Sequence, residues 1–185
     1  MAVKKTSRDI ILKHAIKLFK IQGYYNTSMA NIAEACGLIK GSIYHHFKSK
    51  EEIGLESLKY IHRYFQDHIY NIAYDSQKDA RERLDLLVQK TDAYFLHSEG
   101  GCLLGNLALE VASQNSTFKE EIREYFDNWV QALRFILSSR YSAEQSDALA
   151  QEAVALTQGA IMMMTLYGSS INYLKVGRKI MALLP

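Results

Sequence analysis

The 185-residue chain contains a single proline, and that proline is its final residue. No internal position therefore loses its backbone N–H donor or is held at the proline φ angle, either of which would interrupt a helix. The Asn-Gly and Asp-Gly pairs that mark tight β-hairpins are also absent. Together these absences favour an all-α fold.

Cysteine and long apolar runs are scarce as well. Cys36 and Cys102 stand 66 positions apart, which matches neither a disulfide framework nor a zinc motif. The longest uninterrupted apolar run has five residues, 160–164. A membrane-spanning helix needs about 20 such residues, and no apolar segment of the signal-peptide kind follows the basic N-terminus. We expect a cytoplasmic protein without a metal ion, a cofactor or a membrane partner.

Motifs that indicate an enzyme are missing too. The chain has no Gly-x-Ser-x-Gly, no His-Glu-x-x-His, no glycine-rich phosphate loop and no carboxylate pair at a fixed spacing. A helical enzyme is therefore a weak alternative, and we expect no catalytic residues.

The net charge of +2 conceals a strong asymmetry. Residues 1–50 hold nine Lys and Arg against two Asp and Glu, whereas the remaining residues hold 13 against 18. A basic head on a mildly acidic body suggests that the head binds a polyanion. Surface lysines also serve solvation alone, so a helical carrier or interaction protein without DNA binding is the alternative from a different class.

Apolar residues recur at helical spacing along the chain. We predict nine helices, at about 7–23, 27–36, 39–47, 49–72, 79–98, 102–112, 117–136, 142–167 and 171–184. Thr6 and Ser7 belong to the capping signature of the first. The second and third are short and joined by a tight turn at Gly37, which predicts a helix-turn-helix. We therefore expect a helix-turn-helix domain at 1–48 and a helical ligand-binding and dimerisation domain at 49–185.

The second helix of such a motif fits the major groove of DNA. In the segment 39–47, Ile43 and Phe47 are four residues apart and should face inward. The start of the preceding helix should offer free N–H groups to a phosphate, and a glycine in the recognition helix leaves room for close approach. The residues that we expect to contact DNA are Thr27, Ser28, Lys40, Gly41, Ser42, Tyr44, His45 and Lys50.

The segment from Thr27 to Glu52, TSMANIAEACGLIKGSIYHHFKSKEE, resembles the DNA-binding signature of the TetR family of bacterial transcriptional repressors. The resemblance implies a homodimer that binds a palindromic operator in double-stranded DNA and is released by a small-molecule inducer. It also implies that the last two helices pair with their twins. Two positions depart from the family pattern and bear on base preference. Ala30 stands where many members have arginine, and Ile39 stands where a small polar residue usually precedes Lys40.

The acidic body is rich in aromatic residues, which either form an ordinary core or line a pocket for an apolar or aromatic inducer. The residues that we predict to line the pocket are Tyr60, Tyr64, Phe65, Tyr94, Cys102 and Trp129. For the dimer face we expect the helices at 142–167 and 171–184, because small residues such as Gly159 and Ala160 permit close helix approach.

Cys102 opens a second possibility for the inducer. The segment 101–110 resembles one in family members that sense reactive electrophiles through a cysteine. A helix N-terminus lowers the pKa of a thiol, and Gly100 and Gly101 should expose it. Thr165 stands where that branch carries a lysine. A reversible ligand and an electrophile- or redox-sensing repressor acting through Cys102 therefore both remain open.

Overall fold

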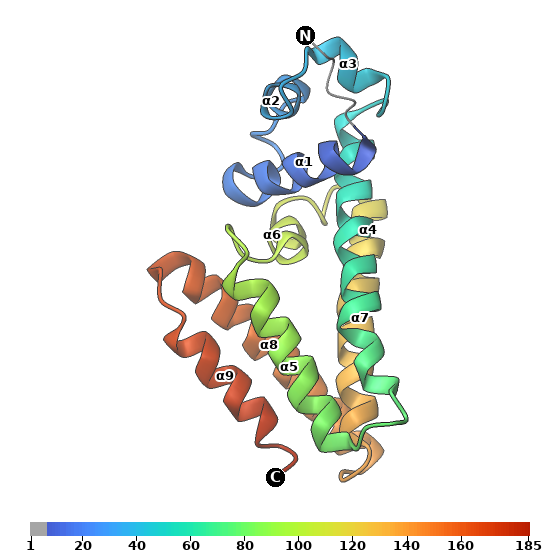
Figure 1. Ribbon diagram of the computed structural model, residues 1–185, viewed down its shortest axis with the longest axis vertical. Helices are drawn as coiled ribbons and strands as arrows, with labels where there is room; N and C mark the ends of the chain where they lie inside the picture. Colours follow the sequence, from blue (N-terminus) through green and yellow to red (C-terminus); the bar gives the residue numbers. More distant parts are fainter. Residues whose placement is uncertain (1–6) are drawn as a thin grey trace. The chain divides into compact units, whose positions relative to one another are not determined.

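The computed structural model describes residues 7–185, so Thr6 of the expected cap lies outside the described residues. Within them all regular structure is helical, which confirms the all-α prediction (Figure 1). The elements are α1 (Arg8–Gln22), α2 (Met29–Ala35), α3 (Lys40–Tyr44), α4 (Lys50–His68), the 3-10 helix η1 (Tyr70–Tyr74), α5 (Ala80–Leu96), α6 (Leu103–Glu110), α7 (Ser116–Leu137), α8 (Ala143–Tyr167) and α9 (Ile171–Met181).

Local sequence explains where most of these helices begin. Ser28, Asp79 and Ser142 form capping boxes at the starts of α2, α5 and α8, each with the residue three positions later. Each box satisfies N–H groups that a helix start leaves without a partner. Gly168 ends α8 at a φ of +65°, a left-handed conformation that glycine adopts without strain.

The predicted helix at 49–72 is shorter in the structure. α4 ends at His68, and a 3-10 turn follows after Ile69 leaves the helical region. This turn places Tyr70 fully inside the protein, where its hydroxyl donates to the carbonyl oxygen of Tyr125 at 3.2 Å. Burial of one large side chain with its polar end satisfied therefore overrides the helical spacing of the sequence.

The chain divides into two compact units. The first contains the residues up to Ile61 together with Leu103–Ile122, and the second contains His62–Cys102 and Arg123–Pro185. The structure thus divides the chain differently from the predicted boundary after residue 48, because α6 and the start of α7 join the helix-turn-helix. In the first unit, α1 contributes the buried Ile11, Ala15 and Phe19 to the core.

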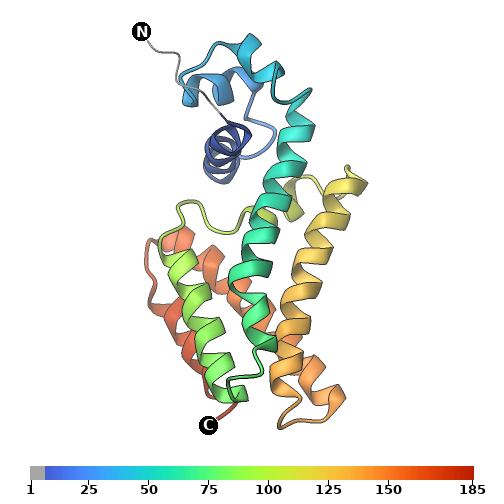
Figure 2. The ribbon, with the colours of Figure 1, turned by 45° about the vertical axis from the view of Figure 1, so that its right-hand side comes forward.

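The second unit is a helical bundle with an aromatic core. α9 packs against both α5 and α8 (Figure 2). Phe65 lies at the centre of the aromatic cluster, with its ring centroid 4.7 Å from that of Tyr94 and 5.1 Å from that of Tyr125. Among residues 7–185, no helix combines the length and the apolar character that crossing a membrane requires.

Candidate DNA-binding surface and effector cavity

The recognition helix α3 has one buried and one exposed side. Ile43 and Phe47 are almost completely buried, as their spacing predicted. Lys40, Tyr44 and His45 are exposed, and Ser42 is half-buried. Gly41 is exposed, and a Cβ atom there would meet no other atom within 4 Å. The outward side chains therefore combine a cation, a phenol and an imidazole beside an unobstructed stretch of backbone.

Arg8 fixes the end of α3, a role that the sequence did not reveal. Its guanidinium lies 3.9 Å from the ring centroid of Phe47 and donates to the carbonyl oxygen of His46. It also pairs with Glu52 at 3.2 Å, and Glu52 accepts the backbone N–H of Lys48 at 2.7 Å. These contacts, led by the Lys48 N–H, lower the pKa of the Glu52 carboxyl and join α1, α3 and α4.

The expectation that Thr27 offers a free N–H to DNA is wrong. Thr27 is completely buried, and its N–H donates to the carbonyl oxygen of Tyr24 at 3.2 Å. Its hydroxyl donates to the carbonyl oxygen of Gly23 at 2.7 Å. The N–H of Ser28 is also occupied, because it donates to Asn31 Oδ1 at 2.9 Å. Only Ser28 of the two keeps an exposed side chain.

Lys50 lies at the edge of the same unit and is half-buried. Its Nζ donates to the carbonyl oxygen of Tyr24 at 3.0 Å and lies 4.4 Å from the centroid of that ring. Burial lowers the pKa of Lys50, and Glu110 acts against this shift. Burial likewise raises the pKa of Tyr24 to about 12. An ammonium carries three donors, so the bond to Tyr24 leaves others for a phosphate.

Glu110, at the end of α6, binds the loop after α1. Its carboxylate accepts the backbone N–H groups of Tyr24 and Tyr25 at 2.8 and 2.7 Å. The Tyr25 hydroxyl donates to Gln114 Oε1 at 2.7 Å. Charged acceptors make stronger bonds than neutral ones. α6 is therefore attached directly to the loop that precedes the helix-turn-helix.

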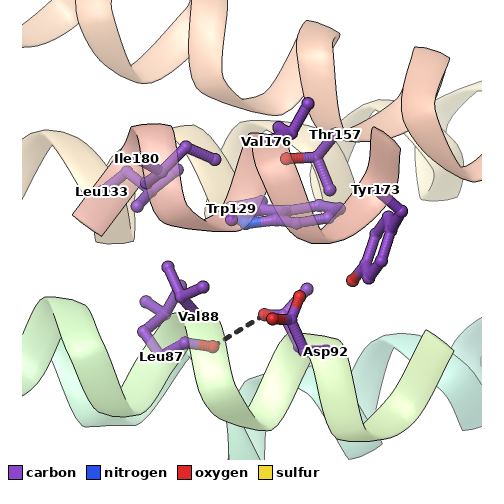
Figure 3. Close-up of a pocket in the computed structure, with 11 residues that line it drawn as sticks. Leu87, Val88, Asp92, Trp129, Leu133, Thr157, Tyr173, Val176 and Ile180 are labelled. Atoms are coloured by element: carbon purple, nitrogen blue, oxygen red, sulfur yellow. Dashed lines mark hydrogen bonds between the residues drawn. The ribbon is translucent and has the colours of Figure 1, made fainter. Parts of the chain in front are cut away.

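A cavity in the second unit lies between α5, α7, α8 and α9 (Figure 3). The space between its side chains is about 320 Å³ when the mouth open to solvent is included, and its water-accessible volume is about 20 Å³, room for about one water molecule. The lining residues are Leu87, Val88, Thr91, Asp92, Trp129, Leu133, Thr157, Tyr173, Val176, Gly177 and Ile180.

The cavity is apolar apart from the indole N–H of Trp129 and the polar groups of two threonines, a tyrosine and an aspartate. The Thr91 and Thr157 hydroxyls donate to carbonyl oxygens of their own helices, at 2.8 and 2.7 Å. Tyr173 is 2% exposed, and the interaction of its hydroxyl with the Asp92 carboxyl works against the rise in the pKa of Asp92 that burial causes. Figure 3 shows this hydroxyl directed toward Asp92. Burial raises the pKa of the half-buried Asp92 carboxyl. The sequence carried one signal for Asp92, since it stands four residues after the inward-facing Val88.

The predicted pocket residues occupy other places, apart from Trp129. Phe65, Tyr64 and Tyr94 belong to the aromatic core of the second unit, and only Tyr64 among them is exposed. Tyr60 belongs to the first unit. Tyr64, Phe65 and Tyr94 pack on one another instead of lining the cavity.

Cys102 is 4% exposed, so the expectation that Gly100 and Gly101 expose it is wrong. Neither Cys36 nor Cys102 forms a disulfide. A buried thiol is poorly placed to meet an electrophile from solvent.

The outer side of α8 and α9 carries an open apolar groove of about 480 Å³. Its lining includes Leu156, Gly159, Met162 and Met163, and Met162 is 58% exposed. Apolar patches of this kind mark interaction surfaces. The groove coincides with the predicted dimer face, which stays a prediction.

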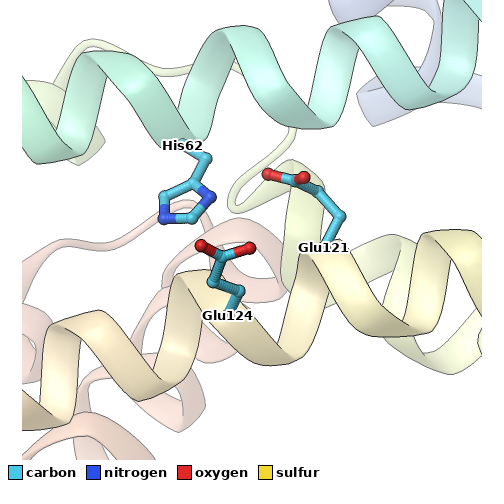
Figure 4. A group of neighbouring side chains, drawn as sticks. All are labelled: His62, Glu121 and Glu124. Atoms are coloured by element: carbon cyan, nitrogen blue, oxygen red, sulfur yellow. The ribbon is translucent and has the colours of Figure 1, made fainter.

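Figure 4 draws the carboxylates of Glu121 and Glu124 together with His62. These are residue types that ligate metal ions. Glu121 belongs to the first unit and the other two residues to the second, so we assign no metal to this group.

Comparison with known proteins supports this division of roles. Residues 11–56 match the family "Bacterial regulatory proteins, tetR family", and residues 80–178 match "Transcriptional regulator LmrA/YxaF-like, C-terminal domain". The uncharacterized HTH-type transcriptional regulator YxaF of Bacillus subtilis is 29% identical over 167 residues, covering 88% of this chain and 87% of the relative. The HTH-type transcriptional regulator LmrA of the same organism is 27% identical over 161 residues, covering 85% of each.

The fold is shared with solved structures as well. A TetR transcriptional regulator from Legionella pneumophila superimposes with a TM-score of 0.84 and 26% identity, covering 97% of both chains. The C-terminal family match alone spans more than half of the chain. The protein therefore belongs to the tetR family of bacterial regulatory proteins and is a DNA-binding transcriptional regulator with an LmrA/YxaF-like C-terminal domain.

Proposed function

We propose that the protein is a cytoplasmic, non-enzymatic repressor that binds a palindromic operator as a homodimer and is released by a small molecule held in the α5–α9 cavity. The observation that carries DNA recognition is the two-sided α3. Its apolar residues are buried, and Lys40, Tyr44 and His45 are left at the surface. Lysine contacts guanine acceptors or phosphates, and phenol and imidazole groups donate to phosphates.

Homodimerisation follows from the size of the binding module. One helix-turn-helix buries only about 600–1,000 Å² of protein surface on DNA, so two are needed for operator affinity. Their recognition helices must lie about 34–36 Å apart, one turn of DNA. The groove on α8 and α9 supplies the surface through which the twin chains would pair.

The effector cavity shares one lining residue with that groove. Val176 lines both the cavity and the outer groove, so one residue of α9 contacts both spaces. An effector that widens the cavity would displace α9 and alter the dimer face. Coupling free energies between such sites are typically about 1–3 kcal/mol. A noncovalent effector fits better than attack at Cys102, because that thiol is buried.

DNA binding is tested by gel shift with the promoter DNA beside the protein's own gene. Lys40→Ala and Tyr44→Ala should weaken the shift at least about tenfold, the loss of roughly one charge-assisted contact. Lys40→Ala should also make the slope of log affinity against log salt concentration shallower by about 1, the contribution of one phosphate contact. Lys90→Ala removes a lysine of α5 that is also exposed and serves as the control. Equal shifts for all four proteins would contradict the proposed surface.

A further inference from the structure

The cavity of Figure 3 contains a negative charge without a positive counterpart. Asp92 is the only acidic group among the eleven lining residues, and none of them is Lys, Arg or His. No hydrogen bond or ion pair within the described residues brings a cation to Asp92. A half-buried carboxylate in apolar surroundings is costly unless something pairs with it.

The wall opposite Asp92 is arranged around this carboxylate. A Cβ atom at Gly177 would lie 3.2 Å from Asp92 Oδ2 and 3.2 Å from Val88 Cγ1, so any larger residue would crowd the group. Tyr173 directs its buried hydroxyl toward the same carboxylate. An acidic group and a neighbouring hydroxyl, whose oxygen can still accept a hydrogen bond, therefore lie together in an otherwise apolar space.

Trp129 supplies the third feature. Its indole, 2% exposed, lies along the cavity between α5 and α8 (Figure 3). Indole faces attract cations and pack against flat apolar groups. The cavity thus offers a carboxylate, a hydroxyl and an aromatic face.

Accepting the effector site proposed above, we infer that its ligand is a small protonated amine with an aromatic or apolar body. The ligand's ammonium pairs with Asp92. Because an ammonium cannot accept a hydrogen bond, the Tyr173 hydroxyl donates to Asp92 or to a water beside it. The enclosed part of the cavity has room for only about one water, so it takes the ammonium beside Asp92 and Trp129. The apolar body of the ligand extends into the open mouth.

Two probes of matched size test the charge requirement. 2-Phenylethylamine is protonated at neutral pH, and 2-phenylethanol replaces its ammonium with a hydroxyl. Trp129 is the single tryptophan of the chain, so its fluorescence reports on the cavity directly. The intact protein should bind the amine at least about tenfold more tightly than the alcohol, as expected for one charge-assisted hydrogen bond.

The variants then assign this preference to residues. Asp92→Asn keeps the shape and removes the charge, and should bring the two dissociation constants within about twofold of each other. Asp127→Asn makes the same change at an exposed position of α7, two residues from Trp129, and should keep the preference. Tyr173→Phe should weaken amine binding while leaving the preference for charge.

The amine site would be refuted if the native protein bound both probes equally, or bound neither up to about 10 mM, which corresponds to a binding free energy of only a few kcal/mol. An unchanged preference for the amine in Asp92→Asn would refute it as well. The gel shift repeated with the amine tests the effector role separately. Binding in the cavity without operator release would refute ligand-induced release and leave the amine site standing.

Discussion

Ile39 leaves 78% of its surface exposed immediately before the recognition helix, although it is a large apolar residue. The thymine methyl is the apolar group that the major groove presents. We expect Ile39 to contact such a methyl and so favour thymine at one operator position.

Selection of bound duplexes from a random pool checks this. The native protein should enrich one thymine position that Ile39→Ser no longer enriches. Replacing that thymine by uracil, which lacks the methyl, should weaken binding by the native protein a few-fold, in keeping with the about 1–3 kcal/mol of a base contact. Ile21→Ser, at an exposed isoleucine of α1, should leave the selected sequence unchanged. Identical enriched sequences for native protein and Ile39→Ser would refute the contact.

Asp92 should make folding stability depend on pH. Burial raises its pKa in the folded state above the unfolded value. The folded protein therefore binds a proton more readily, so this group's contribution is most favourable below the unfolded pKa and falls as pH rises through the folded pKa. At pH 7 Asp92→Asn should melt at a higher temperature than the native protein, and the difference should shrink as the pH falls toward about 4, near the ordinary aspartate pKa. A difference in Tm that is the same at both pH values would contradict this.

Among the helices, α4 depends most visibly on a small residue. A Cβ atom at Gly54 would lie 2.5 Å from Phe118 Cζ and 2.9 Å from Tyr24 Cε2. Alanine raises helix propensity by about 1 kcal/mol over glycine, but overpacking costs about 1–3 kcal/mol. Both ring atoms belong to buried side chains that have little room to move. We therefore expect the cost of overpacking to exceed the gain in helix propensity.

Urea denaturation of Gly54→Ala should therefore show a lower free energy of unfolding. The control is Gly41→Ala in α3, outside the predicted dimer face, where a Cβ atom meets nothing within 4 Å. That substitution should stabilise the protein by about 0.5–1 kcal/mol, because only the helix propensity changes. A Gly54→Ala protein as stable as the Gly41→Ala protein would show that the rings move aside at little cost.

The helices themselves were largely predictable because their signals are local. Ser28, Asp79 and Ser142 each start a helix with a partner three residues later, and a capping box needs no other part of the chain. The end of α4 was not predictable in the same way. It is decided by the burial of Tyr70 and its bond to Tyr125, which is 55 positions away in the chain.

At the scale of the whole molecule, the unpaired face of α8 and α9 should hold two chains together. Met162 is 58% exposed in the open groove. Met162→Glu would bury a charge without a partner in the dimer, which costs several kcal/mol. We expect sedimentation to show monomers and the operator affinity to fall at least about tenfold, since one module alone buries too little surface on DNA.

Leu109→Glu is the control, because Leu109 is 91% exposed in the first unit and lies outside that face. The Leu109→Glu protein should stay dimeric and bind DNA with native affinity. Dimers that persist in Met162→Glu at micromolar concentration would place the dimer face elsewhere.

The helical class, the helix starts and the two-sided recognition helix are predictable from local sequence, because caps, turns and the spacing of Ile43 and Phe47 act over a few residues. Tertiary packing sets which chemical groups meet in the cavity. Asp92, Trp129 and Tyr173 come from three helices far apart in the chain, and no local pattern brings them together. It also decided that Thr27 and Cys102 are buried, because burial depends on what packs against a side chain and not on its neighbours in sequence.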